Sequence, residues 1–168
     1  MSSHKPVAID VVSDVICPWC YIGKRRLETA LELLAGEVPI TLNWLPFQLN
    51  PDMPRSGMLR EEYRRAKFGS LERSRSLDAR IVSEGKGVGI AFAFERIERT
   101  PNTFAAHQMI ELAQERGAGN AVVEALFRAY FEDALDIGDY EVLKSIAQAC
   151  GLDAAFYITH GSACSRVC

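Results

Sequence analysis

Two cysteines separated by two residues stand at the boundary between a segment with strand character and a segment with helical character. Val7–Val12 is a short run rich in β-branched residues, which is typical of a mostly buried strand. From residue 21 to residue 35 apolar side chains recur at helical spacing, and Gly36 is a suitable place for the helix to end. The motif at Cys17–Cys20, CPWC, is therefore predicted to lie where a strand passes into a helix.

A second strand is predicted at Ile40–Leu45, so that strand, helix and strand form a βαβ unit. Helical periodicity dominates the following hundred or so residues. One helix in this part is predicted to begin at Thr100–Pro101, with threonine as the N-cap and proline in the first turn. We therefore expect an α/β fold in which residues 1–56 form the βαβ portion, residues 57–151 form a helical subdomain, and residues 152–168 form an atypical tail.

The predicted position at a helix N-terminus suits this cysteine pair to redox chemistry. The helix dipole and the free backbone N–H groups there stabilise a thiolate, so Cys17 is expected to have the lower pKa and to attack first. Cys20 lies one turn later, where it can resolve a mixed disulfide formed at Cys17. Pro18 fixes the loop and Trp19 presents an aromatic face, which makes both candidate substrate-binding residues. The alternatives for such a pair are half of a structural zinc site and two buried structural thiols.

Length and charge restrict the classes of partner. A chain of 168 residues can form one domain with a packed core, and its formal net charge of -3 gives no electrostatic reason to expect nucleic acid or an anionic membrane. Residues 1–12 lack the pattern of a signal peptide, and no apolar stretch is long enough for a membrane span. We therefore expect a cytoplasmic protein, in which five cysteines favour redox or metal chemistry over structural disulfides.

Several segments, in order along the chain, resemble the DsbA-like family that includes the FrnE proteins. The active-site stretch is Asp14–Lys24, and the further matching segments are Trp44–Pro51, Arg99–His107 and Asp136–Asp139. The resemblance covers roughly residues 7–154 and implies a thioredoxin-like fold with an inserted all-helical subdomain. It also implies a thiol–disulfide oxidoreductase that acts on protein or small-molecule thiols and disulfides, with no cofactor besides its own redox-active disulfide.

The same resemblance suggests further residues that meet the substrate. In the family, the helix that follows Thr100–Pro101 faces the active-site cleft, so Asn102 and His107 are candidate substrate-binding residues. A cap role for Asn102 and a structural role for His107 are the alternatives. Related 2-hydroxychromene-2-carboxylate isomerases and kappa-class glutathione transferases typically have serine at the position of Cys17. Glutathione-dependent isomerase or transferase chemistry, with glutathione as co-substrate, is therefore the enzymatic alternative, and a non-catalytic thioredoxin-like binding module is another.

The C-terminal part departs from the family pattern. No proline follows Pro101, so the family's cis-proline loop is not expected, and the tail does not resemble the family's last strands and closing helix. We therefore expect these strands to be missing, which would expose a sheet edge and favour a homodimer. His160, Cys164 and Cys168 recur at four-residue spacing, but spacing alone is weak evidence, and no metal site is predicted.

Three further predictions concern the surroundings of individual side chains. The charged run Lys24–Arg26 is interpreted as a solvated face of its helix. Trp44 and Phe47 are predicted to lie in the core. Cys150, on the apolar face of a predicted helix, is expected to act as a small buried hydrophobic residue.

Overall fold

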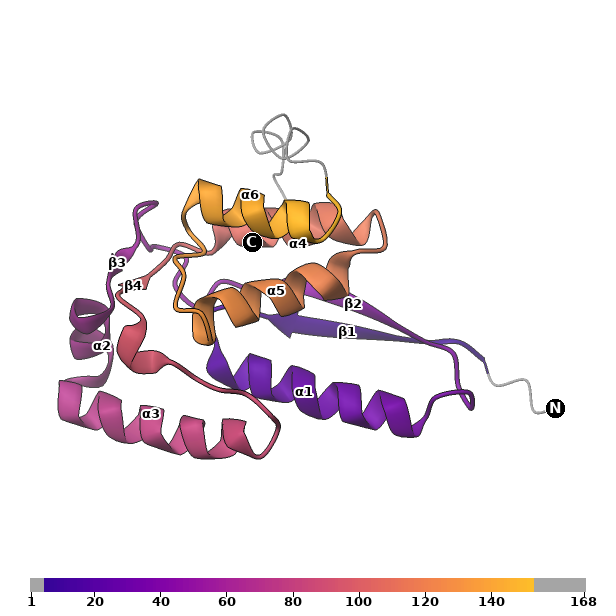
Figure 1. Cartoon of the computed structure of the whole chain (residues 1–168), viewed down its shortest axis with the longest axis horizontal. Coiled ribbons are helices and arrows are strands. Elements are labelled where there is room, and N and C mark those ends of the chain that lie inside the picture. Colours follow the sequence, from indigo (N-terminus) through magenta and orange to yellow (C-terminus); the bar gives the residue numbers. More distant parts are fainter. Residues whose placement is uncertain (1–4, 153–168) are drawn as a thin grey trace.

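The N-terminal part of the protein is a βαβ unit. A computed structural model describes residues 5–152. Strand β1 (Val7–Ser13) leads into helix α1 (Pro18–Leu33), and the chain returns in strand β2 (Ile40–Pro46). The two strands pair in parallel along their whole length (Figure 1). The predicted strand–helix–strand order is confirmed, with the cysteine motif at the start of α1.

The remainder of the described chain is mainly helical. It contains β3 (Met58–Leu59), α2 (Arg60–Phe68), α3 (Leu71–Lys86), a 3-10 turn (Phe94–Arg96), β4 (Arg99–Thr100), α4 (Phe104–Gln114), α5 (Gly119–Phe131) and α6 (Tyr140–Ala149). Strands β3 and β4 pair antiparallel in a second small sheet. The predicted α/β class is thus confirmed, but residues 57–151 are not all-helical, because β3 and β4 lie among them. Within the described ranges, no helix has the length and apolar character needed to cross a membrane.

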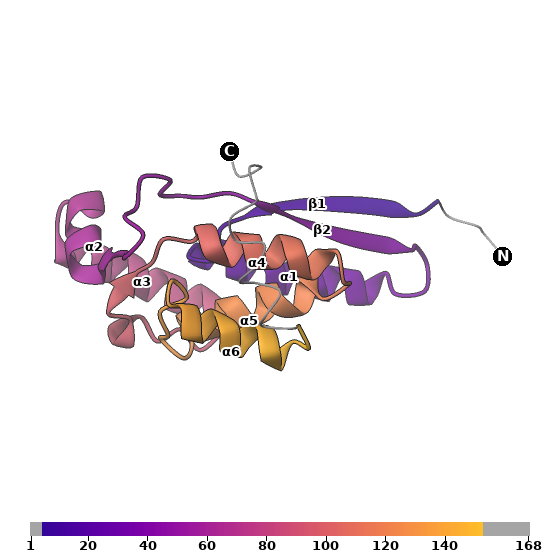
Figure 2. The same ribbon diagram turned by 90° about the horizontal axis from the view of Figure 1, so that it is seen from above.

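The β1–β2 sheet lies on one side of a layer of helices (Figure 2). Helices α4 and α5 contact β2, and Trp44 of this strand is buried as predicted. Side chains alternate between the two faces of a strand, so Leu45, one residue later, points away from the helices and is exposed. Phe47 follows the same alternation and is 48% exposed. Its predicted core position is therefore wrong, because it falls on the uncovered face.

The predicted helix start at Thr100–Pro101 is also wrong. Thr100 ends β4, where it pairs with Met58, and α4 begins only at Phe104. The side-chain oxygen of Asn102 accepts a hydrogen bond from the backbone N–H of Phe104 at 2.9 Å. Pairing with a distant strand therefore occupies Thr100. The N-cap residue of α4 is Thr103, and the side chain of Asn102, one residue earlier, accepts from the first N–H of the helix.

Stacked aromatic rings join α1 to the helical part of the core. The buried ring of Tyr21 lies parallel to Phe127, with 4.9 Å between ring centroids, and Phe92 stacks on Phe94 at 4.8 Å. Such pairs contribute about 0.5–1.5 kcal/mol each beyond the area they bury. Cys150, at the end of α6, packs against this core but is only partly buried, so it is less enclosed than the buried residue expected there.

Two glycines in helices provide a matched test of this packing. A methyl group at Gly85 would lie 2.5 Å from the Phe92 ring, whereas one at Gly23 has nothing within 4 Å. We expect Gly85→Ala to lower the free energy of unfolding by about 1–3 kcal/mol, because the ring must move in a packed core. Gly23→Ala should raise it by about 0.5–1 kcal/mol through helix propensity. Urea unfolding followed by circular dichroism measures both, and equal effects of the same sign would contradict the described packing.

Candidate active site

The cysteine motif forms the first turn of α1. Cys17 is the N-cap residue, with extended backbone angles, and Pro18 occupies the first helical turn. The backbone N–H of Cys17 donates to the carbonyl of Asp14 at 2.9 Å, and that of Cys20 donates to the carbonyl of Cys17 at 3.0 Å. Proline is well suited to this place, because the first N–H groups of a helix have no partner within it. The turn places both cysteines at the helix N-terminus as free, half-buried thiols.

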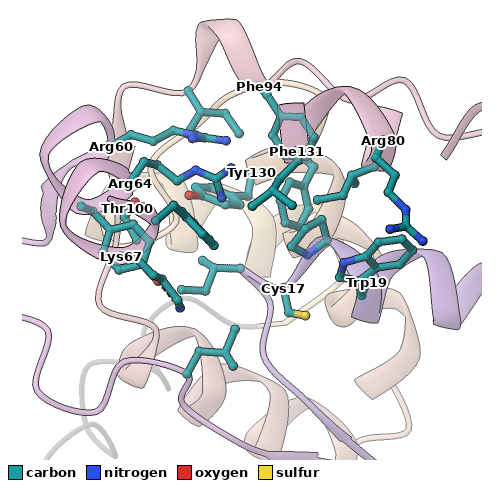
Figure 3. A pocket seen from close by; sticks show the side chains of 18 residues that line it. Cys17, Trp19, Arg60, Arg64, Lys67, Arg80, Phe94, Thr100, Tyr130 and Phe131 are labelled. Carbon is teal, nitrogen blue, oxygen red and sulfur yellow. Dashed lines mark hydrogen bonds between the residues drawn. The ribbon is translucent and has the colours of Figure 1, made fainter. Parts of the chain in front are cut away.

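A cavity of about 390 Å³ opens beside Cys17 (Figure 3). Pro18 and Trp19 line it together with Cys17, and the Trp19 side chain is 45% exposed. Cys20 is not among its lining residues and packs against the hydrophobic core. The cavity therefore gives a substrate access to Cys17 and not to Cys20, and the substrate-binding roles of Pro18 and Trp19 stay predictions.

The far walls of the cavity come from the helical part of the chain. Helix α5 contributes Tyr130 and Phe131, and the 3-10 turn contributes Phe94. Cationic side chains reach the cavity from α2 and α3: Arg60, Arg64, Lys67 and Arg80. Sequence reasoning missed these cations. The only signal in the sequence is the high density of arginine and lysine from residue 60 to residue 80, which does not say which of them share a face.

A hydrogen bond between the two thiols couples their ionisation. The Cys17 thiol donates to the Cys20 sulfur and lowers the pKa of Cys20 to about 6, against an ordinary value of 9.0. Burial opposes this shift, whereas the backbone of Asp14 and the hydroxyl of Ser13 reinforce it. The same hydrogen bond, together with burial, raises the pKa of Cys17. Near neutral pH the pair therefore holds one proton and one negative charge.

The expectation that Cys17 has the lower pKa stays a prediction, because the two thiols share one proton and the hydrogen bond between them leaves it on Cys17 in this arrangement. Backbone hydrogen bonds from Trp19 and Cys20 at the helix terminus do lower the pKa of Cys17, as the sequence analysis assumed. The hydrogen bond to Cys20 and the burial of Cys17 outweigh them. Local sequence gives the helix terminus, but it does not give the orientation of one thiol toward the other.

A buried carboxylate lies behind the cysteine pair. Asp14 is 1% exposed, and its Oδ2 accepts a hydrogen bond from the backbone N–H of Leu49 at 2.7 Å. Its Oδ1 lies 3.2 Å from Nε2 of the buried His107. The hydroxyl of Ser13 is buried nearby and helps to hold the pKa of Cys20 low. Asp14 is a site residue that the sequence analysis treated only as part of a motif.

Asn102 and His107 are not brought to the cavity beside Cys17. The side-chain amide of Asn102 donates to the carbonyl of Met53 at 2.6 Å, so it ties a loop to the start of α4. His107 faces Asp14 from within the core and is 2% exposed. Their predicted contact with substrate is not supported by these positions, and the structural alternatives describe both residues. The start of α4 lies beside the Met53 loop, and the substrate-binding roles of Asn102 and His107 stay predictions.

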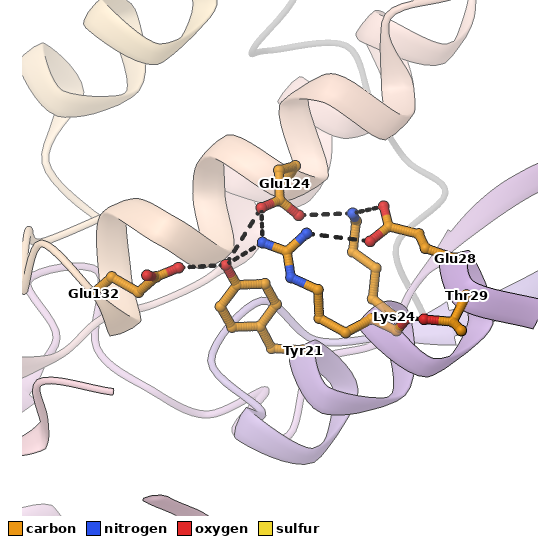
Figure 4. Close-up of polar contacts among 7 residues, drawn as sticks. Tyr21, Lys24, Glu28, Thr29, Glu124 and Glu132 are labelled. Carbon is orange, nitrogen blue, oxygen red and sulfur yellow. Dashed lines mark hydrogen bonds and ion pairs between the residues drawn. The ribbon is translucent and has the colours of Figure 1, made fainter. Parts of the chain in front are cut away.

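Ion pairs hold α1, which carries the cysteines, against α5 (Figure 4). Nζ of Lys24 lies 2.7 Å from Glu124 of α5 and also contacts Glu28, and Arg25 lies 2.5 Å from Glu124. We call Lys24, Arg25, Glu28 and Glu124 the α1–α5 ion-pair cluster. Burial raises the pKa of Glu124, but the hydrogen bond and charge of Lys24, with Arg25, outweigh it and hold this pKa below its ordinary value.

The interpretation of Lys24–Arg26 as a solvated face is therefore wrong for its first two residues. Lys24 is only 2% exposed, and Arg25 is half-buried. Only Arg26 is exposed, in an ion pair with Glu84 at 2.7 Å. Glu28 is a local partner of both residues, but Glu124, which draws them against α5, is about a hundred residues away, so the local charge pattern did not indicate their burial.

The chain is similar to a known protein family and to a protein of Bacillus subtilis. The model of the DSBA-like thioredoxin domain matches residues 8–162, beyond residue 154 where the resemblance was predicted to end. The chain is 27% identical over 152 residues to the uncharacterized protein YwbO of Bacillus subtilis (strain 168), covering 90% of this chain and 70% of that protein.

Two solved structures are similar. A probable DsbA oxidoreductase from Streptomyces coelicolor has a TM-score of 0.82 at 28% identity, covering 90% of this chain and 66% of that one. A proposed protein disulfide isomerase from Nitrosomonas europaea has a TM-score of 0.62 at 16% identity, covering 93% of this chain and 70% of that one, and shows the fold alone. The chain thus spans just under two thirds of the Streptomyces structure.

The shared proton predicts two separate thiol titrations. With Cys150, Cys164 and Cys168 replaced by serine, ultraviolet thiolate absorbance should show one thiolate forming with a midpoint near pH 6. The second should form only above pH 9, because the remaining thiol has a raised pKa. In this background Cys17→Ala should move the Cys20 midpoint upward toward 9.0, since the donor thiol is lost. A Cys17→Ala variant that still titrates near pH 6 would refute the hydrogen bond as the cause.

Proposed function

This chain belongs to the DSBA-like thioredoxin domain family, and on that premise we propose that it is a thiol–disulfide oxidoreductase in which Cys17 attacks and Cys20 resolves. One observation carries the assignment of roles. The two thiols are hydrogen-bonded at a helix N-terminus, and of these two cysteines only Cys17 lines the cavity. The similarity to the Streptomyces protein supports oxidoreductase chemistry of this general kind. Protein or small-molecule thiols and disulfides are the proposed partners.

The exchange proceeds in two displacements. The Cys17 sulfur attacks one sulfur of a substrate disulfide, whose S–S bond breaks and releases a first thiolate. Before this attack Cys17 must become a thiolate. Because the two cysteines share one proton, it does so when that proton moves to Cys20. Cys20 then gives up the proton and attacks the Cys17 sulfur of the mixed disulfide, which releases the second thiolate. The substrate gains two electrons and two protons, and the cysteine pair becomes a disulfide. The reverse sequence oxidises a dithiol.

Asp14 assists this transfer of charge as a positioning residue. Against the hydrogen bond from Cys17, the carboxylate of Asp14 acts to raise the pKa of Cys20. Its charge therefore disfavours a thiolate on Cys20 and favours movement of the negative charge toward Cys17, where the substrate arrives. Its fixed hydrogen bonds with Leu49 and His107 hold the carboxylate in this place.

A second sulfur beside Cys17 favours redox exchange over a glutathione-dependent isomerase or transferase reaction, because such a reaction does not require a resolving thiol. We propose glutathione as a co-substrate that returns the oxidised pair to the dithiol, in the cytoplasmic compartment that the sequence predicts. Two molecules of glutathione supply the two electrons and two protons and leave as glutathione disulfide.

Turnover of insulin disulfides with glutathione as reductant tests the proposal. Cys17→Ser should abolish turnover, because the attacking sulfur is lost. Cys20→Ser should accumulate a mixed disulfide at Cys17, visible by mass spectrometry, because the resolving sulfur is lost. Cys150→Ser is the matched control and should leave the rate unchanged, since burial raises the pKa of Cys150 and keeps this thiol protonated.

Other outcomes distinguish the alternative functions. Full turnover by Cys17→Ser would contradict the proposed attack. Glutathione-stimulated isomerisation without redox turnover would indicate an isomerase. A cysteine pair that neither glutathione nor a small disulfide can oxidise or reduce would indicate a non-catalytic binding module.

A further inference from the structure

The cavity beside Cys17 combines a cationic rim with the absence of any acidic lining residue. Four cationic side chains line it, and no aspartate or glutamate does so among the residues that the structure describes. Figure 3 shows Arg80 beside Trp19 on one side and Arg60, Arg64 and Lys67 on the other, with Cys17 between the two groups. A group bound in this cavity therefore lies between positive charges.

Arg60 and Arg64 share a single carboxylate. Arg60 lies 3.1 Å from Asp78 of α3, and Arg64 contacts the other oxygen of the same carboxylate. The Nε of Arg64 also donates to the hydroxyl of Ser74 at 2.6 Å. Burial lowers the pKa of Arg64; Asp78 opposes this, and the neighbouring charge of Arg60 adds to it. Two guanidinium groups against one anion leave an excess of positive charge in this part of the rim.

Lys67 and Arg80 have no anionic partner in the described chain. The ammonium of Lys67 donates to the phenol oxygen of Tyr63 at 2.6 Å, which leaves its charge uncompensated. Arg80 makes no hydrogen bond or ion pair with another described residue. Both side chains are exposed, so they can rearrange toward a ligand without breaking an internal ion pair. The rim is thus suited to a carboxylate, which guanidinium groups bind in a bidentate manner.

The walls between these cations are apolar and aromatic. Phe94, Ile97 and Phe131 are buried side chains that line the cavity. Burial raises the pKa of Tyr130 to about 12, so its phenol stays neutral, and its hydroxyl donates to the carbonyl of Arg99 at 3.3 Å. A polar peptide group would lose its hydration against these walls without gaining partners, whereas a ring or branched hydrocarbon would pack against them.

We propose that the substrate exchanging with Cys17 is a small thiol or disulfide whose apolar, ring-sized body occupies this cavity and whose carboxylate contacts the cationic rim. This inference rests on the proposed function. The volume of about 390 Å³ lies within the range of about 300–1,000 Å³ of sites that enclose small ligands. An extended protein segment instead needs an open groove or a sheet edge.

The exchange with such a disulfide is balanced. The Cys17–Cys20 dithiol gives two electrons and two protons to R–S–S–R, which leaves as two R–SH molecules, and the protein pair becomes a disulfide. Glutathione, the reductant named above, has carboxylates without an apolar body. It engages the rim alone and binds more weakly than the proposed substrate class.

Two aromatic disulfides test the proposal, one of which is anionic and one of which is neutral. Dithiobis(nitrobenzoate) carries carboxylates and dithiodipyridine is neutral, and each releases a product that is followed by its absorbance when Cys17 attacks. In the full chain, Lys67→Gln/Arg80→Gln should slow reaction with dithiobis(nitrobenzoate) about tenfold at low salt, because two rim charges are lost. The reaction with dithiodipyridine should change by less than about twofold, since it depends on the thiolate and the apolar walls alone.

The matched control removes two charges outside the cavity. Arg73 and Lys86 are exposed residues of α3 that do not line the cavity, so Arg73→Gln/Lys86→Gln should leave both rates within about twofold of the unmodified chain. Equal slowing by the control pair would show a general effect of net charge and would overturn the proposal. Equal slowing of both disulfides by the rim pair would place the effect on the Cys17 thiolate and would also overturn it.

Two further measurements separate this inference from the proposed function. If neither small disulfide nor insulin oxidises the cysteine pair of the unmodified chain, the proposed function itself fails. If insulin turnover falls about tenfold in the rim pair while the reaction with dithiobis(nitrobenzoate) does not change, the rim serves a protein substrate and the small-molecule assignment fails while the oxidoreductase stands.

Discussion

The contact between α1 and α5 sets the geometry on which the candidate site depends. The N-terminus of α1 carries Cys17, and the last turn of α5 carries Tyr130 and Phe131, which form the opposite wall of the cavity. Tyr21, one residue after the cysteine motif, stacks on α5, and the α1–α5 ion-pair cluster fixes the next turn. A buried charge that loses its partner is strongly destabilising, so the cluster disfavours sliding of one helix along the other. The distance from the Cys17 sulfur to the cavity wall is therefore set by core packing.

Electrostatics differ on the two sides of the cysteine pair. Behind it, the carboxylate of Asp14 acts against a thiolate on Cys20, and in front of it four cations surround the space that Cys17 faces. The hydrogen bond between the thiols stabilises one thiolate near neutral pH. Because a disulfide has no such charge to stabilise, every interaction that favours the thiolate favours the reduced pair and makes the disulfide a better oxidant. The low pKa of Cys20 and the cationic rim therefore favour the reduced pair, whereas the carboxylate of Asp14 disfavours it.

Short-range patterns predicted the parts of the protein that local interactions determine. A run of β-branched residues predicted β1, and helical spacing predicted α1 and the position of the cysteines at its start. Errors occurred where a distant partner decides the outcome. Thr100 pairs with Met58 in place of capping a helix, and Lys24 meets Glu124 in place of solvent. The side-chain amide of Asn102 similarly donates to the carbonyl of Met53, and no local sequence pattern indicates this long-range contact.

The cationic cavity shows why the specificity of such a site is harder to predict than its chemistry. The proposed exchange at Cys17 uses a helix terminus and a neighbouring thiol, both of which lie within four consecutive residues. The surroundings of the sulfur come from α2, α3, the 3-10 turn and α5, which are joined only by tertiary packing. Because α2 is rich in arginine, several of its faces could meet solvent. The ion pairs of Arg60 and Arg64 with Asp78 fix the face on which these two residues line the cavity. The proposed reaction thus rests on a short cysteine motif, while the proposed substrate class rests on pairs of residues that are far apart in the chain.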